Sequence, residues 1–161
     1  MLLRIIAVGK LKEKYLREGV AEYTKRLQLY AKVQHLEIPD QKIPEGASPA
    51  EEQLILTKEG EGILKYINAP GPGAVVVLDR QGQNFSSEEL AAWVQKIMLG
   101  GQSQINWIIG GTLGLDPRVM EQAALRLSFS RLTFPHQLMR LILLEQIYRS
   151  FKILRNEPYH R

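Results

Sequence analysis

Residues 105–140, INWIIGGTLGLDPRVMEQAALRLSFSRLTFPHQLMR, decide the fold that we predict for this chain. The apolar run at residues 105–109 stops at Gly110 and Gly111, and a second strand-like run, residues 127–134, stops at Pro135 before a long apolar helix. Ligands of open α/β sheets bind at the carboxyl ends of strands. We therefore expect the loops that follow these two runs to hold a nucleotide-like cofactor.

Strand-like and helical segments alternate along the rest of the 161 residues. The expected strands are residues 2–8, 33–38, 74–79, 105–109 and 127–133. The expected helices are residues 11–29, 49–67, 87–99, 117–125 and 135–154, and residues 80–86 are expected to form a polar loop. A strand followed by a helix, repeated five times, predicts an α/β fold with one domain, residues 1–161, in which helices flank a mainly parallel sheet.

The composition excludes several kinds of chemistry. The chain has no cysteine, which excludes disulfides, thiolate metal ligands and a cysteine nucleophile, the group that enzymes methylating a pyrimidine carbon usually use. The three histidines lie far apart in sequence, so we expect no metal site. No stretch approaches the roughly 20 apolar residues of a membrane span, and the apolar run at the N-terminus is too short for a signal peptide. We expect a cytoplasmic protein without a membrane partner.

Positive charge gathers at the two ends of the chain. Residues 1–32 hold eight basic and three acidic side chains, and residues 118–161 also hold eight and three, whereas residues 37–61 hold two and seven. If the two ends meet in the fold, they form one basic face suited to a phosphate backbone. The alternative is a set of solvated helix faces.

The glycine pair does not have the spacing of a phosphate-binding loop. Neither GxGxxG nor a P-loop is present, so a dinucleotide is not favoured. Glycines at a strand end allow the backbone to approach a flat ligand closely, and Gly114 adds freedom to the same loop. A plain turn is the alternative. Residues 129–134, FSRLTF, could likewise form a mostly apolar wall with a few polar backbone groups, or could be ordinary core residues.

The last expected helix is apolar around most of its circumference. Such a helix is buried on more than one side, so we predict a homodimer with two-fold symmetry through this helix. Complete burial within one subunit is the alternative. The chain then ends in Tyr159, His160 and Arg161, which combine a stacking ring, a titratable imidazole and a cation. Terminal residues are often disordered, so this tail is either functional or a mobile end.

Several motifs together resemble one family over the whole chain. These are AVGKLKEKY at residues 7–15, KEGEGIL at 58–64, VVVLDRQG at 75–82, IIGGTLGL at 108–115, LSFSRLTFPHQLMRLILLEQIYRSFKI at 127–153 and PYHR at 158–161. The chain resembles the ribosomal RNA large-subunit methyltransferase H family, a minimal branch of the SPOUT superfamily. The resemblance implies a homodimer and a trefoil knot in the carboxyl-terminal half, which departs from the unknotted default of α/β domains.

The same resemblance implies an S-adenosylmethionine-dependent methyltransferase. Members methylate N3 of a pseudouridine in the helix 69 loop of 23S ribosomal RNA, on the assembled 70S ribosome. By similarity, the cofactor-binding positions are Leu78, Gly110, Phe129, Ser130, Arg131, Leu132, Thr133 and Phe134.

We hypothesise that the carboxyl-terminal residues act on the RNA substrate. His160 is a candidate general base because its unperturbed pKa suits proton transfer near neutral pH. Arg161 could stabilise a developing oxyanion, and Tyr159 completes the group. Phosphate contacts are expected from Lys10, Lys12, Lys14 and Arg17.

Two other functions compete with this interpretation. A catalytically silent, ribosome-associated RNA-binding dimer would keep the fold, but it is expected to carry bulky or charged residues in place of Gly110. A flavodoxin-like nucleotide-binding protein is less favoured because no phosphate-binding loop follows the first strand.

Overall fold

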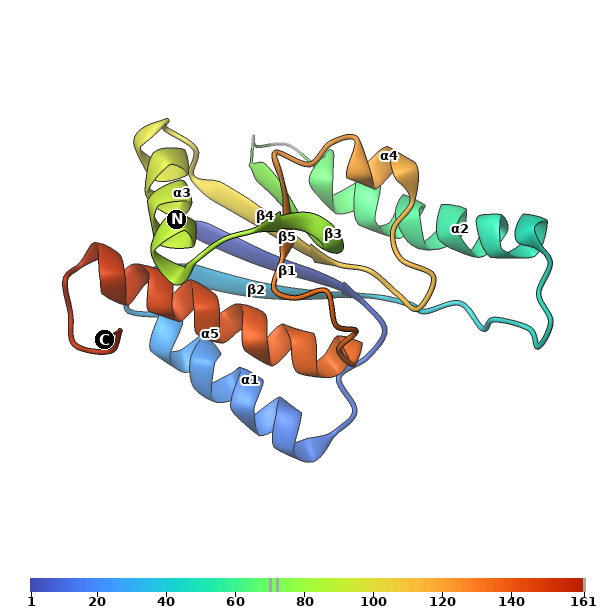
Figure 1. The fold of residues 1–161 in the computed structure, drawn as a ribbon, viewed down its shortest axis with the longest axis horizontal. Helices are drawn as coiled ribbons and strands as arrows, with labels where there is room; N and C mark the ends of the chain where they lie inside the picture. Colours follow the sequence, from blue (N-terminus) through green and yellow to red (C-terminus); the bar gives the residue numbers. More distant parts are fainter. Residues whose placement is uncertain (70, 72, 161) are drawn as a thin grey trace.

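Five strands form one parallel sheet in the order β2-β1-β4-β3-β5 (Figure 1). The computed structural model describes residues 1–69, 71 and 73–160. The central strand β4 pairs in parallel with β1 and β3, β1 also pairs with β2, and β3 also pairs with β5. The strands are β1 (Leu2–Val8), β2 (Lys32–Ile38), β3 (Ala74–Asn84), β4 (Gln104–Ile109) and β5 (Leu125–Ser128). The predicted α/β fold with a parallel sheet is confirmed.

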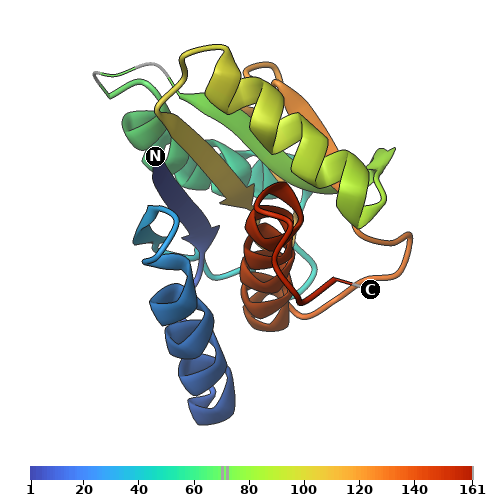
Figure 2. The same cartoon turned by 90° about the vertical axis from the view of Figure 1, so that its left-hand side faces the viewer.

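Helices cover both faces of this sheet. One layer holds α1 (Lys14–Leu27), α3 (Ser87–Leu99) and α5 (His136–Leu154), which Figures 1 and 2 show on the same side. The other layer holds α2 (Pro49–Ile67) and the short α4 (Pro117–Met120). Within β1, Leu3 and Ile5 pack into the first layer, whereas Ile6 and Val8 pack into the second. Strands covered on both faces have continuous apolar sequences, which explains the lack of alternation in β1, β3 and β4.

Helix starts follow the capping residues in the sequence. The side chain of Ser48 accepts a hydrogen bond from the Glu51 N–H, and the Glu51 carboxylate accepts one from the Ser48 N–H. Ser86 and Glu89 form the same reciprocal pair at the start of α3. Each capping box satisfies two backbone donors that a helix start would otherwise leave free.

Several predicted boundaries are wrong, and α1 is Lys14–Leu27 and not residues 11–29. Residues 80–84 extend β3 instead of belonging to a loop, because Gln83 and Asn84 pair with Leu127 and Ser128 after an irregular stretch. The last strand is Leu125–Ser128 and not residues 127–133, and α4 ends at Met120 and not near residue 125. The expected break at residues 68–73 lies partly outside the described residues. The physical reason is common to the errors in β3 and β5, since pairing between these two strands decides where each one ends.

Helix α5 lies between α1 and α3 on the sheet (Figure 2). None of its residues is fully exposed, and Leu143, Leu144 and Ile147 are completely buried. Much of its apolar circumference is therefore covered within one subunit, but Leu138, Leu141 and Ile142 are only partly buried, so the burial is not complete. The homodimer stays a prediction. The trefoil knot also stays a prediction, because strand pairing describes neighbours in the sheet and not how the chain is threaded.

Candidate functional site

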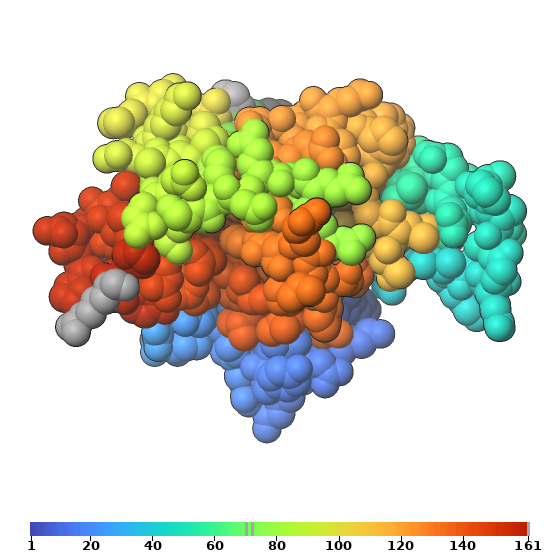
Figure 3. Space-filling view, viewed as in Figure 1, coloured from blue at the N-terminus to red at the C-terminus, as the bar shows by residue number. Residues whose placement is uncertain are grey.

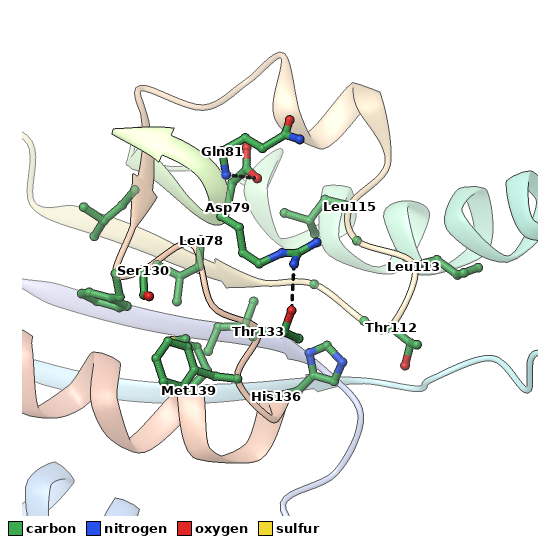
Figure 4. Close-up of a pocket in the computed structure, with 18 of the residues that line it drawn as sticks. Leu78, Asp79, Gln81, Thr112, Leu113, Leu115, Ser130, Thr133, His136 and Met139 are labelled. Carbon is green, nitrogen blue, oxygen red and sulfur yellow. Dashed lines mark hydrogen bonds between the residues drawn. The ribbon is translucent and has the colours of Figure 1, made fainter. Parts of the chain in front are cut away.

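A cavity of about 370 Å³ opens at the carboxyl ends of β3, β4 and β5 (Figure 4). We call it the strand-end cavity. Ligand sites typically span about 300–1,000 Å³ and are mostly apolar with a few polar groups. Seven of the eight positions expected to bind a cofactor line it: Leu78, Gly110, Phe129, Ser130, Leu132, Thr133 and Phe134. The eighth, Arg131, is exposed and does not line the cavity.

The glycine loop forms one wall of this cavity. Gly114 has a φ of +93°, a conformation that favours glycine. A Cβ on Gly110 would lie 2.6 Å from the carbonyl oxygen of Gly114, so position 110 has no room for a side chain. The plain turn and the ligand site are therefore not exclusive, because the same tight turn presents Gly110–Leu115 to the cavity.

The wall opposite is residues 129–134, and polar contacts fix this loop to β3. Arg80 Nη1 donates a 2.7 Å hydrogen bond to Thr133 Oγ1 across the cavity mouth (Figure 4). Ser128 Oγ bonds to the carbonyl oxygen of Arg80 at 3.1 Å. In the space-filling view the end of β3 (green) and this loop (orange) lie against each other (Figure 3). Leu132 stays 70% exposed in this loop, which leaves an apolar side chain free to cover a ligand.

Several lining residues were not predicted from the sequence. The middle of β3 contributes Asp79, Arg80 and Gln81, and the start of α5 contributes His136 and Met139. Figure 4 shows Met139 and His136 on the side of the cavity formed by α5, with Leu78 and Ser130 above them in the view. The residues of β3 could have been found by applying the strand-end rule to that strand as well. His136 carries no such signal, because it reaches the cavity only through the placement of α5.

Asp79 is held ionised beside this cavity. Partial burial favours its neutral form, but hydrogen bonds from Arg126 and from the Gln81 N–H outweigh the burial and hold the pKa of Asp79 below its ordinary value. The Arg126 pair also ties the end of β3 to β5. Asp79 therefore helps to fix the shape of the cavity mouth and also gives it a negative charge.

A second cavity of about 160 Å³ adjoins the first. We call it the Glu59 cavity. It lies beyond the carboxyl ends of β1 and β2, and the two cavities share four lining residues: Gly111, Thr112, Leu113 and His136. Its rim includes Lys10 and Lys12.

The tail is placed away from both cavities of its own subunit. The Tyr159 hydroxyl lies 3.0 Å from Glu145 Oε1 and 3.1 Å from the Tyr23 hydroxyl. His160 Nε2 lies 2.7 Å from Glu88 Oε1 at the start of α3. Neither Tyr159 nor His160 lines either of these two cavities, and Arg161 lies outside the described residues. The structure thus brings the cofactor positions together but leaves the tail on α5 and α3.

These contacts shift the pKa values of groups in and around the tail. The Glu88 backbone N–H and His160 together lower the pKa of Glu88 to about 2. Burial, together with Tyr23 and Glu145, raises the pKa of the Tyr159 hydroxyl far above its ordinary value. Tyr159 is therefore a neutral hydrogen-bonding group at physiological pH.

The two basic ends of the chain do meet, because α1 packs against α5 (Figure 2). About half of these basic side chains are paired, however, as in Arg26 with Glu22, Arg140 with Glu37, Arg149 with Glu145 and Lys152 with Glu157. Lys10, Lys12 and Arg17 are exposed on the β1–α1 loop and the start of α1 and form no ion pair with a described residue. The same holds for Lys25, Lys32 and Arg131, which lie elsewhere.

Two further classes of site are not found in the part of the chain that the structure describes. No group of three or more potential ligands among its histidine, aspartate and glutamate side chains could hold a metal ion. No described helix is both long and apolar enough to cross a membrane.

The chain is similar to known proteins in both sequence and fold. Residues 1–160 match the family model described as "Predicted SPOUT methyltransferase". The ribosomal RNA large subunit methyltransferase H of Symbiobacterium thermophilum is 53% identical over 161 residues, covering 100% of both chains, and that of Carboxydothermus hydrogenoformans is 54% identical with the same coverage. A solved structure, titled as a probable methylase family protein from Haemophilus influenzae, matches 99% of this chain and 70% of its own with a TM-score of 0.53 at 9% identity. That last likeness concerns the fold alone.

Proposed function

The chain belongs to the ribosomal RNA large subunit methyltransferase H family of SPOUT methyltransferases, and from this premise we propose its reaction. It transfers a methyl group from S-adenosylmethionine to N3 of a pseudouridine in the helix 69 loop of 23S ribosomal RNA. Its substrate is the assembled 70S ribosome, and its place of action is the cytoplasm.

The strand-end cavity is the observation that carries this proposal. Its walls fit a cofactor with a flat heterocycle, since apolar side chains such as Leu78 and Leu132 lie beside turns whose backbone groups are near the surface. The side chain that any other residue would add at Gly110 has no room. Leu78, Gly110 and residues 129–134 would hold the cofactor, which supplies an electrophilic sulfonium methyl group when bound.

Catalysis then rests on positioning. Aligning the attacking nitrogen with the methyl group replaces a bimolecular encounter by a near-unimolecular step, and such alignment can contribute about 7–11 kcal/mol. The hydrogen bond between Arg80 and Thr133 holds the loop at residues 129–134 in place for this purpose. We assign the tail residues Tyr159, His160 and Arg161 to the acceptor RNA, and the trefoil knot and the homodimer belong to the same proposal.

Ribosome binding depends on the exposed cations near the cavities. Lys10, Lys12, Lys14 and Arg17 lie on the β1–α1 loop and the first turn of α1, close to the Glu59 cavity. Each phosphate contact releases counterions, so affinity falls as salt rises. A second subunit and the ribosome surface would complement this patch.

Transfer of labelled methyl groups tests the proposal. Free 23S RNA, isolated large subunits and whole ribosomes, each lacking the modification, are incubated with the protein and S-adenosylmethionine, and the product is mapped by nuclease digestion and mass spectrometry. Transfer to whole ribosomes at N3 of a helix 69 pseudouridine is the expected result. Cofactor binding by calorimetry without transfer to any of the three substrates would contradict it and favour the silent RNA-binding dimer.

A further inference from the structure

Glu59 is a buried carboxylate for which the reaction described above has no role. Its side chain is only 6% exposed and projects from α2 toward the glycine loop. Glu59 Oε1 accepts a 3.0 Å hydrogen bond from the Gln41 N–H. No donor among the described residues bonds to Oε2, and Glu59 forms no ion pair with them. Oε2 is not among the fully buried polar atoms that lack a partner, so this oxygen opens into the Glu59 cavity and can meet a ligand there.

The unsatisfied oxygen lies at the junction of the two cavities. A Cβ on Gly111 would meet Glu59 Oε2 at 2.8 Å, which places that oxygen directly against the glycine pair. Gly111 lines both cavities, together with Thr112, Leu113 and His136. A group seated in the Glu59 cavity would therefore be next to a ligand of the strand-end cavity.

The size of the Glu59 cavity suits one ring. Its volume is about 160 Å³, and a cavity of about 150 Å³ is large enough for a single six-membered ring. Ile43 and Ile55 supply apolar surface for the ring faces, while Lys10 and Lys12 stand at the rim where a phosphate backbone would follow. A lone heterocyclic base attached to RNA matches this combination of apolar wall, internal acceptor and cationic rim.

We propose that the Glu59 cavity receives the acceptor base and that Glu59 Oε2 takes the proton of its ring N–H. The inference rests on the proposed methyl transfer and adds the acceptor subsite to it. The nitrogen lone pair forms the new C–N bond, while the C–S bond of the sulfonium breaks and its electron pair stays on sulfur. The N–H proton moves to Glu59 and later to solvent. Glu59 then acts as the general base, and His160 serves RNA binding.

The electrostatic surroundings of Glu59 suit a proton acceptor. Burial, aided by Asp40 and opposed by the Gln41 N–H and His136, raises the pKa of Glu59 above its ordinary value. Efficient general bases have a pKa near the working pH. The charged and titratable groups that face it are Asp40 after β2, Lys10 and Lys12 after β1, and His136 and Arg140 on α5. Arg140 is engaged by Glu37 and the Gly9 carbonyl oxygen, so it does not neutralise Glu59.

The first test replaces the carboxylate by an amide. Glu59→Gln keeps the shape and can still accept the hydrogen bond from the Gln41 N–H, but it cannot take a proton. Single-turnover methyl transfer on unmodified ribosomes should fall about 100-fold, the lower range of general-base effects, with S-adenosylmethionine affinity unchanged by calorimetry. The wild-type rate should fall as the solution is acidified below neutral pH, and the variant should lose this dependence. Glu59→Asp should recover part of the rate, and Glu61→Gln, an exposed position on the same helix, is the matched control.

A second measurement needs no cofactor. Because the folded pKa of Glu59 is raised, its contribution to stability is complete below the unfolded value of about 4.3 and is lost as pH rises through the folded pKa. The free energy of unfolding of Glu59→Gln, relative to wild type, should therefore increase as the pH rises above about 4.3. Glu61→Gln, at an exposed position on the same helix, is the matched control.

Filling the cavity tests the subsite separately from the base. Ile43 lines the Glu59 cavity and not the strand-end cavity. Ile43→Phe should therefore weaken binding of unmodified ribosomes in the presence of S-adenosylhomocysteine by about tenfold and abolish transfer, with cofactor affinity unchanged. Leu54→Phe, on the exposed side of α2, is the control.

The outcomes separate the two proposals. If wild-type protein transfers no methyl group to any ribosomal substrate, the proposed function fails and this inference fails with it. If wild type is active but Glu59→Gln works within threefold and keeps the same acid limb, or if Ile43→Phe works normally, the subsite is refuted while the function stands.

Discussion

The strand-end cavity and the carboxyl-terminal tail are built in opposite ways. The cavity is made of backbone turns and apolar walls, with Gly110 packed against the Gly114 carbonyl oxygen. The tail is made of side-chain contacts, in which Tyr159 reaches Glu145 and Tyr23 while His160 reaches Glu88. A site built from backbone should lose ligand affinity when its shape is changed, and this affinity should not depend on pH. In a side-chain network, each substitution should remove one contact, and the stability of the network should change with the protonation of its members.

The largest expected effect is at the glycine wall of the cavity. Gly110→Val places a branched side chain where even a Cβ would lie 2.6 Å from the Gly114 carbonyl oxygen. S-adenosylmethionine affinity, measured by calorimetry, should fall more than about 100-fold, since misplaced positioning groups near a site cost about that much. Gly100→Ala is the control, because Gly100 does not line the strand-end cavity and a Cβ there would lie 3.3 Å from the nearest backbone oxygen, a milder contact than the one at Gly110. Undiminished cofactor binding by Gly110→Val would contradict the backbone-built description.

Removing the imidazole of the tail should affect the acceptor and not the cofactor. His160→Ala should raise KM for unmodified ribosomes about tenfold and leave S-adenosylmethionine affinity unchanged, because His160 does not line the strand-end cavity. The acid limb of the rate should also persist, since we assign it to Glu59. Loss of that limb in His160→Ala would return the general-base role to the histidine.

Removing one hydroxyl group should show how much the hydrogen bonds of the tail contribute to stability. Tyr159→Phe removes the hydrogen bonds to Glu145 and Tyr23 but keeps the ring packed edge-on against Tyr148. The free energy of unfolding should fall by about 1 kcal/mol, the usual net value of a hydrogen bond. Denaturant unfolding measures it, with Tyr15→Phe, an exposed tyrosine on α1, as the control. Equal stability in both variants would mean that the tail is not docked in solution.

The smallest effect should appear only in acid. The pKa of Glu88 is lowered to about 2 in the folded protein, so the stability it contributes is present above the unfolded value of about 4.3 and is lost as pH falls through the folded value. The melting temperature of wild type should therefore exceed that of Glu88→Gln near neutral pH. The gap should close between roughly pH 4.3 and pH 2. A gap that is constant over this window would show that the carboxylate is not held by His160 and the helix start.

The elements predicted from the sequence agree best with the structure where interactions between neighbouring residues determine the secondary structure. Strands β1 and β4 and the starts of α2 and α3 are confirmed, because apolar runs and capping residues such as Ser48 and Ser86 act within a few residues. The limits of β3 and β5 are wrong in the prediction, because the extra residues of β3 become strand only by pairing with β5, over 40 residues away along the chain.

By itself, the sequence determined the α/β class, the order of its elements and the strand-end loops that line the larger cavity. It also determined the family, because the matching motifs extend along the whole chain. Only the tertiary structure decided that Glu59, on a helix after the second strand, lies against Gly111, and that His136 joins both cavities. The physical reason is the distance along the chain over which each interaction acts. Periodicity, caps and turns act between neighbours in sequence, whereas the burial and charge of Glu59 depend on packing among β1, β2, α2, the glycine loop and α5.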